Sequence, residues 1–294
     1  MNAARLAQSV FRHGVQRSLS LLPMNVSSFV YRQIKGVCRD LGGREGPRQM
    51  VNLRTGGRML LNLADGQQRH TYYSRLYEYP YIACLKKHFV RSGDHVIDVG
   101  ANVGFYTIWC ALQVGETGSV SAFEPNPRAY AMLEENVALN GLKNVKMFPV
   151  ALTDTDGTVR METRFDDLAL SRIVTSASGK DVMDVPARRL DAVFSSSPPP
   201  RVAFIKIDAE GVEPSVLKGA ERILEKRPVL LIEVDERRLG SAGGSEDALL
   251  GQLKGYGYTP FRLGRTGRLS AFRKSAGRAV RDNLFFVPQE RPLE

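Results

Sequence analysis

The stretch His95-Val-Ile-Asp-Val-Gly-Ala-Asn-Val-Gly-Phe-Tyr-Thr-Ile-Trp109 decides the fold of this chain. Residues 96–99 are largely β-branched and apolar, which predicts a central parallel strand buried on both faces. Gly100 and Gly104 break the strand, and the residues from Phe105 to Leu112 predict a helix. Because glycines let backbone N–H groups approach a ligand closely, this strand, turn and helix predict a site for a nucleotide-like ligand.

The residues around the turn indicate which ligand. A dinucleotide site needs the spacing G-x-G-x-x-G, but Asn102 stands here in place of the middle glycine, and Asp98 lies at the strand end. The Asp98 carboxylate would repel a pyrophosphate and can accept hydrogen bonds from an amino group. Glu124, which ends the next strand, is placed to accept both hydroxyls of a ribose. The combination predicts S-adenosylmethionine, and the alternative is an ordinary turn with solvated carboxylates.

The composition indicates a globular protein of a reducing compartment. The three cysteines are far apart and form no C-x-x-C pair, which argues against zinc and against disulfides. No apolar run approaches the ~20 residues that span a bilayer. We therefore expect a cytoplasmic protein. An organelle matrix is the alternative, because the arginine-rich, acid-free N-terminus resembles a transit peptide.

The formal net charge of +10 is unevenly distributed. No acidic residue precedes Asp40, and none lies between Asp247 and Asp282. Such segments attract anionic substrates, membranes or nucleic acid, or simply form a solvated surface. We interpret residues 1–48 as a helical extension with two helices divided by Pro23, and residues 49–294 as the catalytic domain. Peripheral membrane contact through the basic N-terminus is a further possibility.

The pattern before and after the central strand completes the predicted fold. Residues 49–63 predict a hairpin around a Gly-Gly turn, and residues 72–90 predict one aromatic-rich helix in which Glu78 can accept a hydrogen bond from a ligand amino group. From Asp94 onward, strands and helices alternate, which predicts an α/β fold with a doubly wound, mostly parallel, seven-stranded sheet. The expected strands cover residues 96–99, 120–123, 145–151, 202–207, 229–234, 258–263 and 283–287. One helix is expected over residues 214–224, and residues 158–194 predict an excursion with short strands.

A second group of polar residues lies in Phe204-Ile-Lys-Ile-Asp-Ala-Glu-Gly-Val-Glu213. A lysine in a central strand is costly unless its charge is paired, and Asp208 and Glu210 are the natural partners of Lys206. Methyl transfer from a sulfonium to a hydroxyl requires a group that removes the proton. We predict Asp208 as that base, Glu210 as the second candidate and Lys206 as an orienting charge, against the alternative of a structural ion pair. Converging carboxylates also suit magnesium, but nothing in the sequence favours it and no metal is predicted.

These residues resemble the FkbM family of methyltransferases over roughly residues 70 to 290. The similarity lies in the glycine turn, in Phe123-Glu-Pro-Asn-Pro127 and above all in the Lys-Ile-Asp-x-Glu-Gly-x-Glu run. The resemblance implies a Rossmann-like class I methyltransferase fold and methyl transfer to a hydroxyl of a sugar, glycolipid or related metabolite. By matching position it implies a donor site with the amino-acid part at Gly100, Ala101, Asn102 and Gly104, the ribose at Glu124 and the adenine at Val150 and Ala151, with Phe105 and Pro125 alongside.

Other classes of function predict different features. A nucleic-acid methyltransferase suits the positive charge, but enzymes that methylate base nitrogens usually carry an Asn/Asp-Pro-Pro-aromatic turn where this chain has Asp208-Ala-Glu-Gly. A non-catalytic module would bind the donor without any need for Asp208. An oxidoreductase is the least favoured class, because the turn departs from the dinucleotide pattern. The acceptor and the oligomeric state are not specified by the sequence.

Overall fold

The structure is a computed structural model that describes residues 3–23, 30, 33, 48–163, 168, 171–174, 181–264, 266–274 and 279–291. The helix expected before Pro23 is present as α1, Ala3–Ser20. The second N-terminal helix, expected around residues 29 to 37, lies outside the described residues apart from Val30 and Gln33. Within the described residues, no helix is long and apolar enough to cross a membrane.

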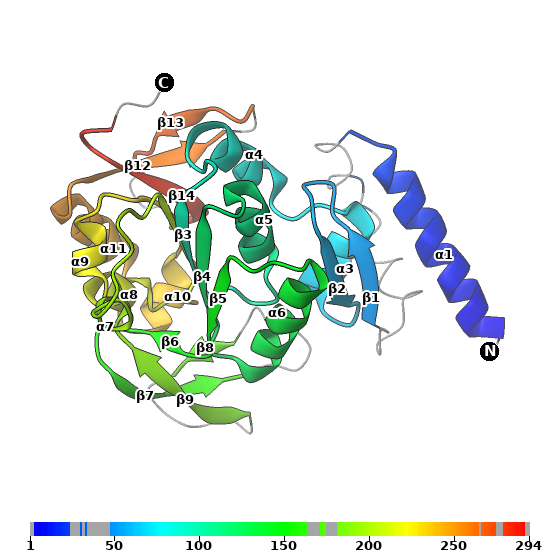
Figure 1. Cartoon of the computed structure of the whole chain (residues 1–294), viewed down its shortest axis with the longest axis horizontal. Coiled ribbons are helices and arrows are strands. Elements are labelled where there is room, and N and C mark those ends of the chain that lie inside the picture. Colours follow the sequence, from blue (N-terminus) through cyan, green and yellow to red (C-terminus); the bar gives the residue numbers. More distant parts are fainter. Residues whose placement is uncertain are drawn as a thin grey trace.

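Strand β3, His95–Val99, lies inside an eight-stranded sheet, paired in parallel with β10 and β4 (Figure 1). Four of the seven strand pairings are parallel, as expected for a doubly wound fold. The strands in spatial order are β13 (Leu269–Ala271), β12 (Tyr258–Leu263), β14 (Arg281–Pro288), β11 (Val229–Asp235), β10 (Phe204–Ile207), β3, β4 (Ser119–Phe123) and β5 (Val145–Phe148). The seven expected strands are all present. The expected number is wrong by one, because β13 is too short to show a pattern.

Helices cover both faces of this sheet (Figure 1). Alternate strand residues point to opposite faces, so Ile205 and Ile207 pack with α8 (Glu213–Lys218), α9 (Glu221–Leu224), α10 (Glu236–Ser241) and α11 (Glu246–Gly255). Phe204 and Val96 pack on the other face against α5, Phe105–Val114, and α4, Tyr79–His88. Each buried apolar side chain contributes roughly 1.5–3 kcal/mol, so the continuous strands fix the sheet between two apolar layers.

A hairpin packs near the glycine turn, and one asparagine is hydrogen-bonded to both. Strands β1, Arg48–Asn52, and β2, Arg58–Asn62, pair as expected. Helix α6, Pro127–Leu139, carries the buried Asn136, whose Oδ1 accepts from Leu60 N at 2.7 Å and whose Nδ2 donates to Val103 O at 2.9 Å. The hairpin and the turn are therefore held to the same helix.

Two expected elements are interrupted where the chain approaches the site. The single helix expected over residues 72–90 is wrong. The chain instead forms α3, Gly66–Ser74, and α4, because Arg75 and Glu78 adopt left-handed φ values of 57° and 40°. Pro80 lacks the N–H that a continuous helix would use, so it is placed in the first turn of the new helix α4, where that N–H is not needed.

The strand expected over residues 145–151 is likewise divided. Pro149 cannot donate to a sheet ladder, and β5 ends just before it. The next strand, β6 (Ala151–Leu152), joins a separate four-stranded sheet with β9 (Val182–Arg188), β7 (Gly157–Glu162) and β8 (Arg172–Ile173). This small sheet confirms the short strands expected after residue 158. The helix expected over residues 214–224 is also divided, into α8 and α9.

Candidate active site

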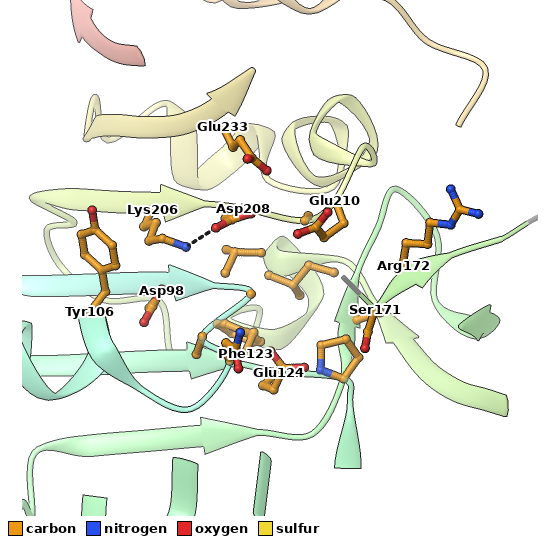
Figure 2. Close-up of a pocket in the computed structure, with 18 of the residues that line it drawn as sticks. Asp98, Tyr106, Phe123, Glu124, Ser171, Arg172, Lys206, Asp208, Glu210 and Glu233 are labelled. Carbon is orange, nitrogen blue, oxygen red and sulfur yellow. Dashed lines mark hydrogen bonds and ion pairs between the residues drawn. The ribbon is translucent and has the colours of Figure 1, made fainter. Parts of the chain in front are cut away.

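A cavity of about 1060 Å³, including its open mouth, lies at the carboxyl ends of β3, β4 and β10 (Figure 2). The sequence placed its candidate residues at this edge, where ligands bind in open α/β sheets. The cavity is lined by Glu78, Asp98, Gly100, Ala101, Asn102, Phe105, Glu124, Pro125, Val150, Ala151, Lys206, Asp208 and Glu210. Gly104 is the single candidate that does not line it.

The two glycines of the turn have different structural roles. Gly100 has a φ of +73°, and a Cβ atom built on it would lie 1.9 Å from the carbonyl oxygen of Asp208. Only glycine therefore allows the turn to pack against the end of β10. Gly104 has a φ of +97° at the start of α5, and a Cβ atom there would meet Leu133 at 2.7 Å. Gly104 thus shapes the helix start and its packing from outside the cavity.

Glu124 lies beside the turn and is 6% exposed. Its carboxylate accepts from Asn102 N and Asn126 N, both at 2.8 Å, so it is held against the backbone of the turn. Burial raises the pKa of Glu124 to about 7, although these two backbone hydrogen bonds lower it.

Lys206 projects from β10 into a cluster of acids and is 6% exposed. Its Nζ lies 3.1 Å from Asp208 Oδ2 and 5.2 Å from the centre of the Tyr106 ring. Burial by itself would lower the pKa of Lys206, but the carboxylates of Asp208, Asp98 and Glu78 raise it above its usual value. The lysine is therefore a fixed cation, as its position in a buried strand predicted.

Asp98 leaves one oxygen available to a ligand. Thr107 Oγ1 donates to Asp98 Oδ2 at 2.6 Å, whereas Oδ1 is buried and has no hydrogen-bond partner among the described residues. A buried oxygen without a partner is costly, and a donor group of a bound ligand would relieve that cost. Burial raises the pKa of Asp98, and Lys206 opposes the increase.

Glu78 closes the cavity from the break between α3 and α4. Tyr106 donates its hydroxyl proton to Glu78 Oε2 at 2.6 Å, and Asn283 Nδ2 donates to Oε1 at 3.3 Å. Neither partner was predicted from the sequence. Asn283 lies directly opposite Glu233 in the ladder, in the polar first part of β14, Arg281-Asp-Asn283, and that run of polar residues at the start of an apolar strand was the available signal.

Three carboxylates meet where β10 and β11 end. One oxygen each from Asp208, Glu210 and Glu233 lies within 4.8 Å of the others, a spacing that could hold a divalent cation. In the structure the guanidinium of Arg238 lies against this group: its Nη1 lies 2.6 Å from Glu210 Oε2 and also contacts Glu233. Burial and the nearby charge of Asp208 raise the pKa of Glu210 to about 9 and that of Glu233 to about 8.

Asp208 is the carboxylate of this group that stays ionised. Burial would raise its pKa, but the Lys206 charge and hydrogen bond, with the Arg238 charge, hold it below the usual value. The turn behind it is fixed by the buried Glu213, which accepts from Ala209 N at 3.0 Å and Gly211 N at 3.1 Å. Glu210 itself adopts a left-handed φ of 58°, so this turn is shaped around its carboxylates.

The small sheet forms the remaining wall, whose individual residues were not predicted from the sequence. Met161 and Ile173 line the cavity with Ser171, whose hydroxyl accepts from Asn126 Nδ2 at 2.8 Å. These residues are distant from the glycine turn in the chain, and no periodic pattern links them to it. Figure 2 shows the charged end of Arg172 directed away from the acidic cluster, and its Nε lies 2.9 Å from Glu162.

A doubly wound sheet of this order, with a glycine turn after its central strand and an acid after the next, defines a class I methyltransferase that uses S-adenosylmethionine. A family model described as the methyltransferase FkbM domain matches residues 98–260, which is 163 of the 294 residues. The chain belongs to the FkbM family of methyltransferases, as the motifs suggested.

Individual proteins match at low sequence identity. The chain is 27% identical to the hexuronic acid methyltransferase AglP of Haloferax volcanii, over 48% of this chain and 56% of that protein. It is 25% identical to the 2-O-methyltransferase NoeI of Sinorhizobium fredii, over 49% and 64%. The match thus spans less than two thirds of either relative. A solved S-adenosylmethionine-dependent O-methyltransferase from Thermotoga maritima aligns at 15% identity and a TM-score of 0.39, over 89% and 83%.

Proposed function

We propose that this methyltransferase acts on oxygen and methylates a hydroxyl of a sugar, glycolipid or related small metabolite. The observation that carries the proposal is Asp208, which lines the cavity beside the glycine turn and is kept ionised by Lys206. The acceptor oxygen attacks the methyl carbon, the carbon–sulfur bond breaks, and the hydroxyl proton passes to Asp208. The products are a methyl ether and S-adenosylhomocysteine. The names of two relatives support methylation of a hydroxyl: AglP is called a hexuronic acid methyltransferase and NoeI a 2-O-methyltransferase.

The donor site is proposed as follows. The turn at Gly100, Ala101 and Asn102 holds the amino-acid part of S-adenosylmethionine, whose amino group donates to the unpaired oxygen of Asp98. Glu124 accepts the ribose hydroxyls, and Val150 and Ala151 border the adenine with Met161 of the small sheet. Glu78, fixed by two hydrogen bonds, faces the amino-acid part from the opposite wall.

The charge of the cavity supports a neutral acceptor over a nucleic acid. The three basic side chains of the cavity are already paired within the chain, Lys206 with Asp208, Arg238 with Glu210 and Arg172 with Glu162, so none is free to hold a phosphate backbone. The surface of the chain is basic, but the cavity has twice as many acids as bases. The acids are Glu78, Asp98, Glu124, Asp208, Glu210 and Glu233, and the bases are Arg172, Lys206 and Arg238.

Calorimetric titration with S-adenosylhomocysteine tests the donor site. We expect the wild type to bind and Glu124→Ala to bind roughly 10- to 100-fold more weakly, because hydrogen bonds to a charged group contribute about 1.5–3 kcal/mol each. The matched control is Glu116→Ala, an exposed acid in the turn after α5, which should not change the affinity. Equal affinity in all three proteins would remove Glu124 from the site.

The affinity for S-adenosylhomocysteine should also depend on pH. Burial raises the pKa of Glu124 to about 7, so below that pH the group is protonated and accepts the ribose hydroxyls poorly. Binding linked to one deprotonation weakens by about tenfold per pH unit below the pKa. We expect this slope in titrations between pH 5.5 and 7, and a flatter profile for Glu124→Gln. A wild-type affinity that is constant over this range would contradict the assignment.

A further inference from the structure

Four arginines line a surface pocket at the amino ends of the parallel strands, opposite the donor cavity. The arginine pocket, as we name it, is lined by Arg91, Arg201, Arg227 and Arg291, with Phe89, Pro288 and Glu290. Arg91, Arg201 and Arg227 precede the parallel strands β3, β10 and β11, whereas the donor cavity lies at the carboxyl ends. Strand β3 has five residues and spans about 16 Å, so the two sites are separate.

The charge of Arg227 is already neutralised. Its guanidinium forms a two-point ion pair with Glu290, at 2.5 and 2.6 Å, and donates to the carbonyl oxygens of Tyr256 and Gly257. Arg227 therefore serves as a fixed side of the pocket. Because Glu290 is engaged in this pair, its charge does little to compensate the other three arginines.

The other three arginines have little compensation from the described part of the chain. Arg201 lies 3.9 Å from Asp94, a long ion pair, while Arg91 and Arg291 form none with any described residue. The Arg291 guanidinium lies 5.5 Å from the centre of the Phe89 ring. Burial lowers the pKa of Arg291, the charges of Arg201 and Arg91 lower it further, and the nearby Asp94 carboxylate only partly opposes this decrease. An anion between them would relieve this repulsion.

We propose that the arginine pocket binds a phosphate group. Planar guanidinium groups donate paired hydrogen bonds that match phosphate oxygens, and three of them line this pocket without a matching number of carboxylates among the described residues. The phosphate can come from a soluble phosphate monoester or from the monoester headgroup of a lipid such as phosphatidic acid, since both present the same dianionic group. The site is independent of the methyl donor and of the acceptor chemistry.

The test compares two triple variants with the same loss of charge. One is Arg91→Gln/Arg201→Gln/Arg291→Gln, and the control is Arg160→Gln/Arg222→Gln/Arg268→Gln, three exposed arginines outside the pocket. Affinity is measured by calorimetry with inorganic phosphate and by co-sedimentation with phosphatidylcholine vesicles, with and without phosphatidic acid. S-adenosylhomocysteine is present throughout, so that a folded donor site is verified in each sample. The single exposed substitution Arg91→Gln provides the same comparison with the least disturbance of packing.

We expect the pocket variant to bind phosphate at least about tenfold more weakly than the control variant, which should behave as the wild type. Loss of binding to phosphatidic acid vesicles in the pocket variant alone would identify a lipid headgroup as the source. Phosphate binding without vesicle binding would identify a soluble ester. The proposal is overturned if the wild type binds neither probe, or if both triple variants lose affinity equally, because the effect would then be one of net charge.

Discussion

Asp208→Asn is expected to lower the methyl-transfer rate by about 100- to 10,000-fold, the usual contribution of a general base, with little change in S-adenosylhomocysteine affinity. Asparagine keeps the shape of the side chain but cannot take up the acceptor proton. Asp208 is the suitable base because Lys206, 3.1 Å away, keeps it ionised at neutral pH. The measurement is a single-turnover rate on an acceptor found by screening hydroxylated glycans and lipids.

The matched control for this prediction is Glu210→Gln. Burial and the neighbouring Asp208 charge raise the pKa of Glu210 to about 9, so at neutral pH this group is already protonated and its replacement by a neutral amide changes little. We expect the Glu210→Gln rate to stay within about tenfold of the wild type. If Glu210→Gln lowered the methyl-transfer rate severely and Asp208→Asn lowered it only mildly, Glu210 and not Asp208 would be the general base.

Gly100→Ala is expected to abolish measurable donor binding and to destabilise the fold by about 4 kcal/mol or more, at the severe end for single substitutions. Left-handed backbone costs a residue with a Cβ atom about 1–2 kcal/mol. At this position the new atom would also lie 1.9 Å from the Asp208 carbonyl oxygen, so the glycine turn and the end of β10 must separate. Denaturant unfolding and calorimetry with S-adenosylhomocysteine measure the two effects.

The variant Gly141→Ala is the control that measures the cost of a left-handed backbone alone, without a steric clash like that between residue 100 and the Asp208 carbonyl oxygen. Gly141 has a similar φ of +64°, but a Cβ atom built there meets nothing within 4 Å. We expect that variant to lose only the backbone cost and to bind the donor normally. If the two alanine variants were equally stable, the contact between Gly100 and Asp208 would not limit the turn.

The alternation of apolar strands and amphipathic helices was sufficient to predict the doubly wound sheet and the edge at which the candidate residues meet. Period-two alternation within the strand also places Lys206 and Asp208 on one face. These are local properties, because each depends on neighbouring residues in one element. The turn at Gly100 and the acid at Glu124 could be predicted for the same reason, because each follows directly after a strand in the sequence.

The features that could not be predicted depend on contacts between distant segments. The helix break at Arg75 and Glu78 is marked only by Pro80, and the aromatic residues around it favour one continuous helix. The pairing of Arg238 with Glu210 and Glu233 requires knowledge of how α10 returns over β11. The wall from β7 and β8 contributes through its position in space, with no motif of its own.

The hydrogen bond between Asn283 and Glu78 joins residues 205 positions apart, so the cavity is completed only after β14 has been synthesised. At about 5–20 residues per second, roughly 10 s or more pass on the ribosome between the two residues. For most of that interval the nascent chain carries Asp98 of β3 and Glu124, which follows β4, without the strand that completes their enclosure. The enclosed cavity therefore forms only once β14 has been made, and a fragment limited to residues 98–260 would lack both Glu78 and Asn283.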